Sequence, residues 1–151
     1  VCSLVSSLPP VLISGFSDEA VRDKSAREQL CVMAALGLRY FTLRFIDLGN
    51  GVKNVMLLDE SELDRLLGLM SEYDMQVSSI GSPIGKVKLL DQDDGTSNRY
   101  VEFARYLDED VSRACQLAQK LQTRLIRGFS FYQPKNQPPE SYLDEAAERL
   151  S

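Results

Sequence analysis

The sequence predicts an α/β protein in which short strands alternate with helices and form a parallel sheet. Two observations carry this prediction: β-branched or aromatic runs alternate with segments whose apolar residues recur at helical spacing, and four such pairs follow one another. Strands that alternate with helices pair in parallel, and the helices cover the sheet. We expect a single α/β domain over residues 1–151, because this length, with 44% hydrophobic and 26% charged residues, is typical of one globular domain.

Two architectures fit four strand–helix units. A (β/α)8 barrel needs about 250 residues, so the chain would supply its N-terminal half. An open doubly wound sheet of this length is the alternative. Neither of the common glycine-rich nucleotide-binding turns follows the first strand, so we favour the first half of a (β/α)8 barrel. Residues 1–10, which contain Pro9-Pro10, are expected to be an extended or disordered leader.

The first two units are marked by clear start and stop signals. Val11–Ile13 is predicted as a strand, and a helix starts at the capping box Ser25-x-x-Glu28 and ends at Gly37. The second strand is predicted over residues 40–46 and stops at residues 49–51. A second helix begins at a further capping box, and its apolar stripe is formed by Leu63, Leu66, Leu67 and Met70.

The last two units are separated by a long polar segment. Residues 77–80 form the third predicted strand, and residues 87–107 have little periodicity, as in a long loop or a broken helix. A helix is predicted over residues 111–121 and a fourth strand over residues 125–131. The final helical pattern, over residues 140–150, is still running where the sequence stops, as in a truncated helix.

Composition narrows the possible functions. The formal charge of −5 argues against binding nucleic acid by phosphate neutralisation, and no apolar run is long enough for a membrane span. Three widely spaced cysteines indicate reduced thiols and a cytoplasmic protein. The chain has no histidine, so it lacks the commonest general base and the usual nitrogen ligand of transition metals.

Working residues in a parallel sheet lie just beyond the carboxyl ends of the strands. Ser82–Lys86 combines a proline, a glycine and a cation, and it is either a ligand-binding turn or an ordinary turn with a solvated lysine. Arg127 and Arg44 each lie within an apolar strand, where a guanidinium either clamps a substrate anion or belongs to a buried structural pair. Asp18 and Glu19 are expected to stabilise the start of a helix.

Two further segments receive structural interpretations. The acidic run over residues 91–95 lacks the spacing of a calcium loop, so we expect a solvated loop. Phe129 and Phe131 are spaced by two residues along the fourth predicted strand, which favours core packing over stacking against a sugar.

Four of these segments resemble the sugar phosphate isomerase/epimerase family of xylose-isomerase-like TIM barrels. The resemblance starts at about Val11 and covers the N-terminal half of that family. The motifs S-P-I-G-K and I-R-x-F-S-F are its most specific parts. The segments are Ser14–Glu19, Tyr40–Arg44, Ser82–Lys86 and Ile126–Tyr132.

The resemblance implies a metal-dependent isomerase or epimerase that acts on a sugar or sugar phosphate by removing a proton next to a carbonyl. It implies that Ser82, Lys86, Arg127 and Arg44 line the substrate pocket. Family members hold a divalent metal (Mn, Mg, Co or Zn) on strands five to eight, so we expect no cofactor and no metal ligand within this chain. Many relatives have Glu where this chain has Thr42, and the missing histidines argue against the related DNA-repair endonucleases.

On this basis the chain would be the N-terminal half of such an enzyme, forming part of the substrate pocket and inactive alone. A second hypothesis is a non-catalytic half barrel that homodimerises through its sheet edges and serves as a binding or structural module. A third is an open α/β binding domain, which would be monomeric with polar or covered sheet edges.

Overall fold

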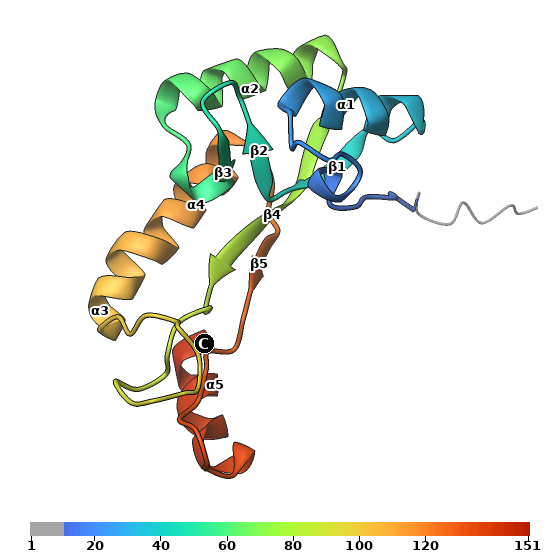
Figure 1. Cartoon of the computed structure of the whole chain (residues 1–151). Helices are drawn as coiled ribbons and strands as arrows, with labels where there is room; N and C mark the ends of the chain where they lie inside the picture. The colour runs from blue at the N-terminus through green and yellow to red at the C-terminus, as the bar shows by residue number, and fades with distance from the viewer. Residues whose placement is uncertain (1–10) are drawn as a thin grey trace, which may run out of the picture.

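A small parallel sheet lies at the centre of the computed structural model, which describes residues 11–151 (Figure 1). Its strand order is β1-β4-β5, so the predicted α/β class with parallel strands is confirmed. Within residues 11–151 the sheet is open and does not close into a barrel. The predicted leader, residues 1–10, lies outside the described residues. The strands of this sheet are β1 (Tyr40–Leu43), β4 (Gln76–Ile84) and β5 (Ile126–Gly128).

Helices connect these strands in the predicted alternation. The π turn η3 joins α3 to α4, so this helical segment runs without interruption from Phe103 to Lys120. The α-helices are α1 (Ala26–Ala35), α2 (Glu60–Glu72), α3 (Phe103–Tyr106), α4 (Ser112–Lys120) and α5 (Leu143–Leu150). The short helical turns are η1 (Ser17–Glu19), η2 (Val55–Leu57), η3 (Leu107–Val111) and η4 (Pro139–Tyr142).

The hydrophobic core joins one face of the sheet to α1, α2 and α4. Its fully buried side chains come from both layers and include Leu30, Phe41, Leu43, Leu63, Leu66, Ile80 and Leu117. Successive strand residues point to opposite faces, so Thr42, between Phe41 and Leu43, faces away from this core. Its hydroxyl lies 2.8 Å from that of Ser79, which gives the other face of the sheet a polar surface.

The first predicted strand is wrong as an element, although the chain does follow the edge of the sheet. Val11–Ile13 forms no strand, and the side chain of Val11 is 88% exposed. Further along, Gly15 accepts a hydrogen bond from the backbone N–H of Thr42 at 2.8 Å, and Phe16 forms a single parallel bridge with Thr42. The apolar run therefore lacks the burial that would fix it as a strand.

The second predicted strand ends earlier than expected, because its last residues belong to a hairpin. After Leu43 the chain enters β2 (Phe45–Asp47), which pairs in antiparallel fashion with β3 (Val52–Asn54). Gly49 and Gly51 have positive φ, and their N–H groups donate to Asp47 Oδ1 at 2.7 and 3.0 Å. The glycines that were interpreted as a strand stop thus form the hairpin turn.

The two predicted capping boxes have different outcomes. At the start of α2, Asp59 and Glu62 each accept the other's backbone N–H, so this capping box is confirmed. Ser25 does precede α1, but its side chain makes no capping hydrogen bond, so that prediction is wrong. The backbone of Ser25 instead bridges to Asp47, which ties the start of α1 to the hairpin.

The remaining elements differ mainly in length. The helix predicted over residues 111–121 begins earlier, at Phe103, so the long polar segment is part loop and part helix. The fourth strand shrinks to Ile126–Gly128, because Phe131 has a left-handed backbone (φ 68°) that ends the extended run. Among residues 11–151, no helix has both the length and the apolar character needed to cross a membrane.

Candidate functional site

Two of the predicted site residues meet at one aromatic ring. Arg44 follows β1 and Arg127 lies in the middle of β5, so they come from strands on either side of β4. The guanidinium carbon of Arg44 lies 4.5 Å from the ring centroid of Phe16, and that of Arg127 lies 5.3 Å from it. Both distances suit cation–π attraction. The structure thus gathers Arg44 and Arg127 into one cluster around Phe16.

Gly81 of β4 makes this cluster possible. A Cβ at this position would lie 2.6 Å from Cβ of Arg44 and 3.0 Å from the ring of Phe16. Those distances are too short for carbon atoms, so only glycine lets both side chains lie over the central strand. Sequence analysis did not single out Gly81, since an isolated glycine in a strand signals a close approach without naming its partner.

Arg44 is neutralised by a buried carboxylate. Its Nε and Nη2 atoms donate to Oδ2 of Asp18 at 3.1 and 2.8 Å, and Nη2 also donates to Glu19 at 2.9 Å. The side chain of Asp18 is 1% exposed, so this is a buried ion pair. The hydrogen bond from Asp18 is the main reason that the pKa of Arg44 is raised above its ordinary value.

Asp18 and Glu19 do lie in the first turn of a short helix, as predicted, but Asp18 also has a partner that the sequence did not indicate. Asp18 lies in the three-residue turn η1, where its carboxylate pairs with Arg44. A buried network holds this turn in place: Ser17 donates to the side-chain oxygen of Gln29 at 2.6 Å, and Gln29 donates to the backbone oxygen of Phe45 at 2.9 Å. In the sequence, Phe16 and Asp18 alternate next to a predicted strand, but no nearby residue identifies Arg44 as the partner of Asp18.

Arg127 differs from Arg44 in its partners. It donates to the backbone oxygens of Ser82 and Gly81, at 3.1 and 3.3 Å from Nη2, and its guanidinium carbon lies 5.0 Å from the ring centroid of Phe129. Among residues 11–151, no carboxylate lies within ion-pair distance of Arg127. Burial, followed by the charge of Arg44, lowers the pKa of Arg127 from its ordinary value. Its positive charge is therefore partly desolvated and available to an anion.

The prediction that Phe129 and Phe131 pack in the core is wrong. Both side chains are only partly buried, and neither belongs to the main core. Phe129 packs against the guanidinium of Arg127, while Phe131 meets the ring of Tyr106 edge to face at 5.8 Å. The period of two was misleading, because β5 ends at Gly128 before either residue.

Ser82 and Lys86 do not join the arginine cluster in the same way. Ser82 is fully buried, and its hydroxyl donates to the backbone oxygen of Arg127 at 2.5 Å and accepts from Ile84 N at 3.2 Å. Ser82 therefore fixes β4 against β5. Lys86 is exposed and lines a separate cavity, to which neither Arg44 nor Arg127 contributes.

The cluster is chemically suited to an anion and unsuited to a metal ion. Oδ1 of Asp18 is buried and accepts no hydrogen bond within residues 11–151, but a cation there would face the guanidinium of Arg44 on the other oxygen. Within the same described range, no group of three or more Asp, Glu, Cys or His side chains is placed to hold a metal. The divalent metal implied by the resemblance therefore does not fit this cluster.

Comparisons with protein-family models and with curated proteins give no match. The functional assignment consequently depends on the arrangement of Arg44, Phe16 and Arg127 and on the four segments quoted above.

Proposed function

We propose that this chain forms one half of a (β/α)8 barrel and that the polar face of its sheet is a wall of a sugar or sugar phosphate pocket. In this proposal the complete barrel is an isomerase or epimerase. The unpaired charge of Arg127 is the observation that carries the proposal, because a half-buried cation without a carboxylate partner within the described residues favours an anionic group of a ligand.

The layer arrangement supports a half barrel over a doubly wound sheet. Along the sheet, Phe16 bridges to β1, β1 pairs with β4, and β4 pairs with β5, so spatial order follows chain order. The core lies between the sheet and α1, α2 and α4, and Figure 1 shows these helices along one side of the strands. A doubly wound domain carries helices on both faces, whereas a barrel carries them only outside.

The cluster offers two kinds of contact to a sugar phosphate. The planar guanidinium of Arg127 presents parallel N–H groups that match a phosphate or carboxylate. The rings of Phe16 and Phe129, both within 5.3 Å of that guanidinium carbon, offer flat apolar surfaces for the C–H groups of a sugar. Arg44, already neutralised by Asp18, would hold the ring of Phe16 in position.

Residues outside this chain would complete the catalytic centre. A divalent metal held there would polarise the carbonyl of the substrate. The described residues would orient the anionic end of the sugar through Arg127 and shield one side of the pocket with Phe16. No proton-transfer role is assigned to Arg44 or Arg127, because both remain charged at neutral pH.

The test is a titration of the full chain with fructose phosphate and with fructose, monitored through the backbone amide resonances of Ser82 and Phe129, which lie beside Arg127 and remain in every variant. We expect saturable shifts with the phosphate, and Arg127→Gln should weaken binding by about tenfold or more, since it removes charged hydrogen bonds. Arg127→Lys keeps the positive charge but loses the planar, forked guanidinium, so its affinity should lie between those of the wild-type chain and Arg127→Gln. Arg124→Gln, which alters an exposed arginine near β5, is the matched control. Equal affinities for the wild-type chain and Arg127→Gln would refute the proposal.

A second candidate is the self-pairing half barrel, and exposed apolar residues near both sheet edges favour it. Leu125, just before β5, is 63% exposed, and Ile13, near the β1 edge, is 68% exposed. A dimer that buries them should have twice the 16.9 kDa chain mass in a native mass spectrum. Leu125→Glu should then shift the spectrum to monomer, and a wild-type monomer at high concentration would exclude this candidate.

A further inference from the structure

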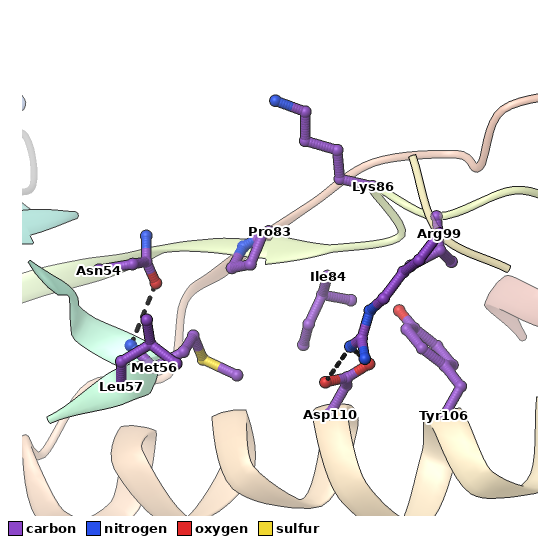
Figure 2. A pocket seen from close by; sticks show the side chains of 10 residues that line it. Asn54, Met56, Leu57, Pro83, Ile84, Lys86, Arg99, Tyr106 and Asp110 are labelled. Carbon is purple, nitrogen blue, oxygen red and sulfur yellow. Dashed lines mark hydrogen bonds and ion pairs between the residues drawn. The ribbon is translucent and has the colours of Figure 1, made fainter. Parts of the chain in front are cut away.

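A cavity lies away from the arginine cluster, between the end of β4 and the helical segment α3–η3–α4. Its volume is about 210 Å³ (Figure 2). One part of its wall is apolar and comes from η2, the end of β4 and the segment just after β4. The residues of this apolar part are Met56, Leu57, Pro83, Ile84 and Val87.

The polar part of the wall is built around the π turn. Tyr106, the last residue of α3, and Asp110, within η3, both line the cavity. Figure 2 shows them side by side along the helix, with the side chain of Arg99 above them. A π turn inside an α-helix is uncommon and frequently marks a functional site, because it redirects side chains that a regular helix would hold elsewhere.

The hydroxyl of Tyr106 is a buried donor available to a ligand. The residue is 3% exposed, and its oxygen accepts the backbone N–H of Gly85 at 2.7 Å. Within residues 11–151 the hydroxyl hydrogen has no acceptor. Burial raises the pKa of Tyr106, so the group stays protonated and keeps its hydrogen at neutral pH.

Arg99 provides further donors. Its Nη2 atom donates to both carboxylate oxygens of Asp110, at 2.9 and 2.6 Å. Its Nε and Nη1 atoms donate to no residue in the described part of the chain. Arg99 and Tyr106 line the same cavity, so the free donors of both side chains belong to its polar wall.

The lining carries more positive than negative charge. Arg99 and Lys86 contribute two cations against the single carboxylate of Asp110. Lys86 lies at the rim, and Figure 2 shows its ammonium group directed away from Arg99. Because Asp110 is paired with Arg99, the excess positive charge is that of Lys86, and it favours the approach of an anion over that of a cation at the rim.

We propose that this cavity binds a small monocarboxylate with a branched aliphatic body. Tyr106 and Arg99 would hold the carboxylate, and the apolar wall would bury the aliphatic part. At about 30 Å³ for each water of the liquid, the cavity has room for roughly seven non-hydrogen atoms. This inference is independent of the proposed sugar site, since neither Arg44 nor Arg127 lines the cavity.

The experiment is a titration of the methyl-labelled full chain with isovalerate, monitored by the methyl resonances of Ile84 and Val87. We expect saturable millimolar binding, as for other fragments of this size. Isovaleramide, which has the same shape without the charge, and acetate, which lacks the aliphatic body, should each bind about tenfold more weakly or worse.

Variants of two lining residues, each with a control variant outside the cavity, test whether isovalerate binds in this cavity. Tyr106→Phe and Arg99→Gln should each weaken isovalerate binding by about tenfold, because each removes a hydrogen bond to a charged group. Tyr100→Phe and Arg22→Gln, which alter exposed residues outside the cavity, should leave the affinity unchanged. Arg99 is exposed, so Arg99→Gln tests the proposal even if Tyr106→Phe fails to fold.

Three results would overturn the proposal. One is the absence of saturable methyl shifts up to about 50 mM isovalerate, far above the expected affinity. The second is equal binding of isovaleramide, which would show that the donors do not recognise charge. The third is that, in a parallel titration of the ¹⁵N-labelled chain, the shifts appear at the backbone amides of Phe16 and Arg127 instead, which would place the carboxylate at the sugar site.

Discussion

Arg44 and Arg127 share a residue type and an aromatic neighbour, yet their surroundings give them different roles. Arg44 makes two hydrogen bonds to a carboxylate that is 1% exposed. Removing it would leave the charge of Asp18 buried without its counter-ion, which is more costly than losing the attraction itself. Arg127 donates only to backbone oxygens among the described residues, so its charge has no carboxylate partner there.

Arg44→Gln should therefore lower the free energy of unfolding by about 3–5 kcal/mol in urea denaturation. Asp18→Asn combined with Arg44→Gln should recover a large part of that loss, because no buried charge remains. Arg27→Gln, which breaks the exposed pair with Glu72, is the control and should change stability little. An Arg44→Gln protein as stable as the wild type would show that Asp18 is solvated.

Glu62 links stability to acid pH. Its hydrogen bonds from Lys53, first, and from the backbone of Asp59 lower its pKa below the ordinary value of 4.5. A depressed folded-state pKa stabilises the protein above 4.5, and this contribution is lost as the pH falls through the folded-state value.

Stability measured by urea denaturation should therefore decline below pH 4.5 less steeply for Glu62→Gln than for the wild type. Glu28→Gln, which changes an exposed carboxyl of α1, is the matched control and should keep the wild-type slope. Identical slopes for Glu62→Gln and the wild type would assign the acid sensitivity to other carboxyls.

At the scale of elements, the connection after β4 depends on one glycine. Gly85 has a positive φ of 75°, and its backbone oxygen accepts from Phe131 N at 3.1 Å. A Cβ here would lie 1.8 Å from the backbone oxygen of Phe129, so the chain after β5 could not approach. Gly95 has nearly the same φ, but there a Cβ would meet only the flexible side chain of Lys135, at 3.5 Å.

Gly85→Ala should therefore be less stable than Gly95→Ala by at least about 1–3 kcal/mol, the usual cost of overpacking. The two variants share the same backbone strain, so their difference in thermal or urea denaturation isolates the clash with Phe129. If the two substitutions cost the same, the close approach of Gly85 to Phe129 does not exist in solution.

Elements with strong local signals were predictable, and those fixed by distant contacts were not. The capping box at Asp59 and the apolar stripe of α2 are encoded within a few residues, and both are found in the structure. Val11–Ile13 has strand-like composition, but no helix covers it. At the site, the sequence could flag Arg44 and Arg127 as charges within strands, whereas Asp18 and Gly81 acquire their roles through residues 26 and 37 positions away.

On the scale of the whole molecule, the chain has a sheet with a partly polar face but lacks histidine, the commonest group for proton transfer. Residues 11–151 hold no cluster of potential metal ligands. In the proposed barrel, the catalytic centre would come from residues beyond this chain.

The 151-residue chain alone should show no detectable turnover of ketose or aldose phosphates, with or without added manganese. The measurement is product formation followed by NMR over a day at high protein concentration. Turnover that chelation abolishes, and that persists after repurification, would contradict this expectation and place a metal centre within the chain.

The polar face that carries Thr42 and Ser79 bears on the solubility of the chain during its synthesis. Barrel interiors are usually filled by branched aliphatic side chains, and these would be exposed and promote aggregation if half a barrel emerged from the ribosome first. In the proposed half barrel, the face that would meet the remaining strands instead carries the partly exposed polar side chains Ser79 and Arg127. A nascent half barrel with this surface would then remain dispersed in water until the other strands are made.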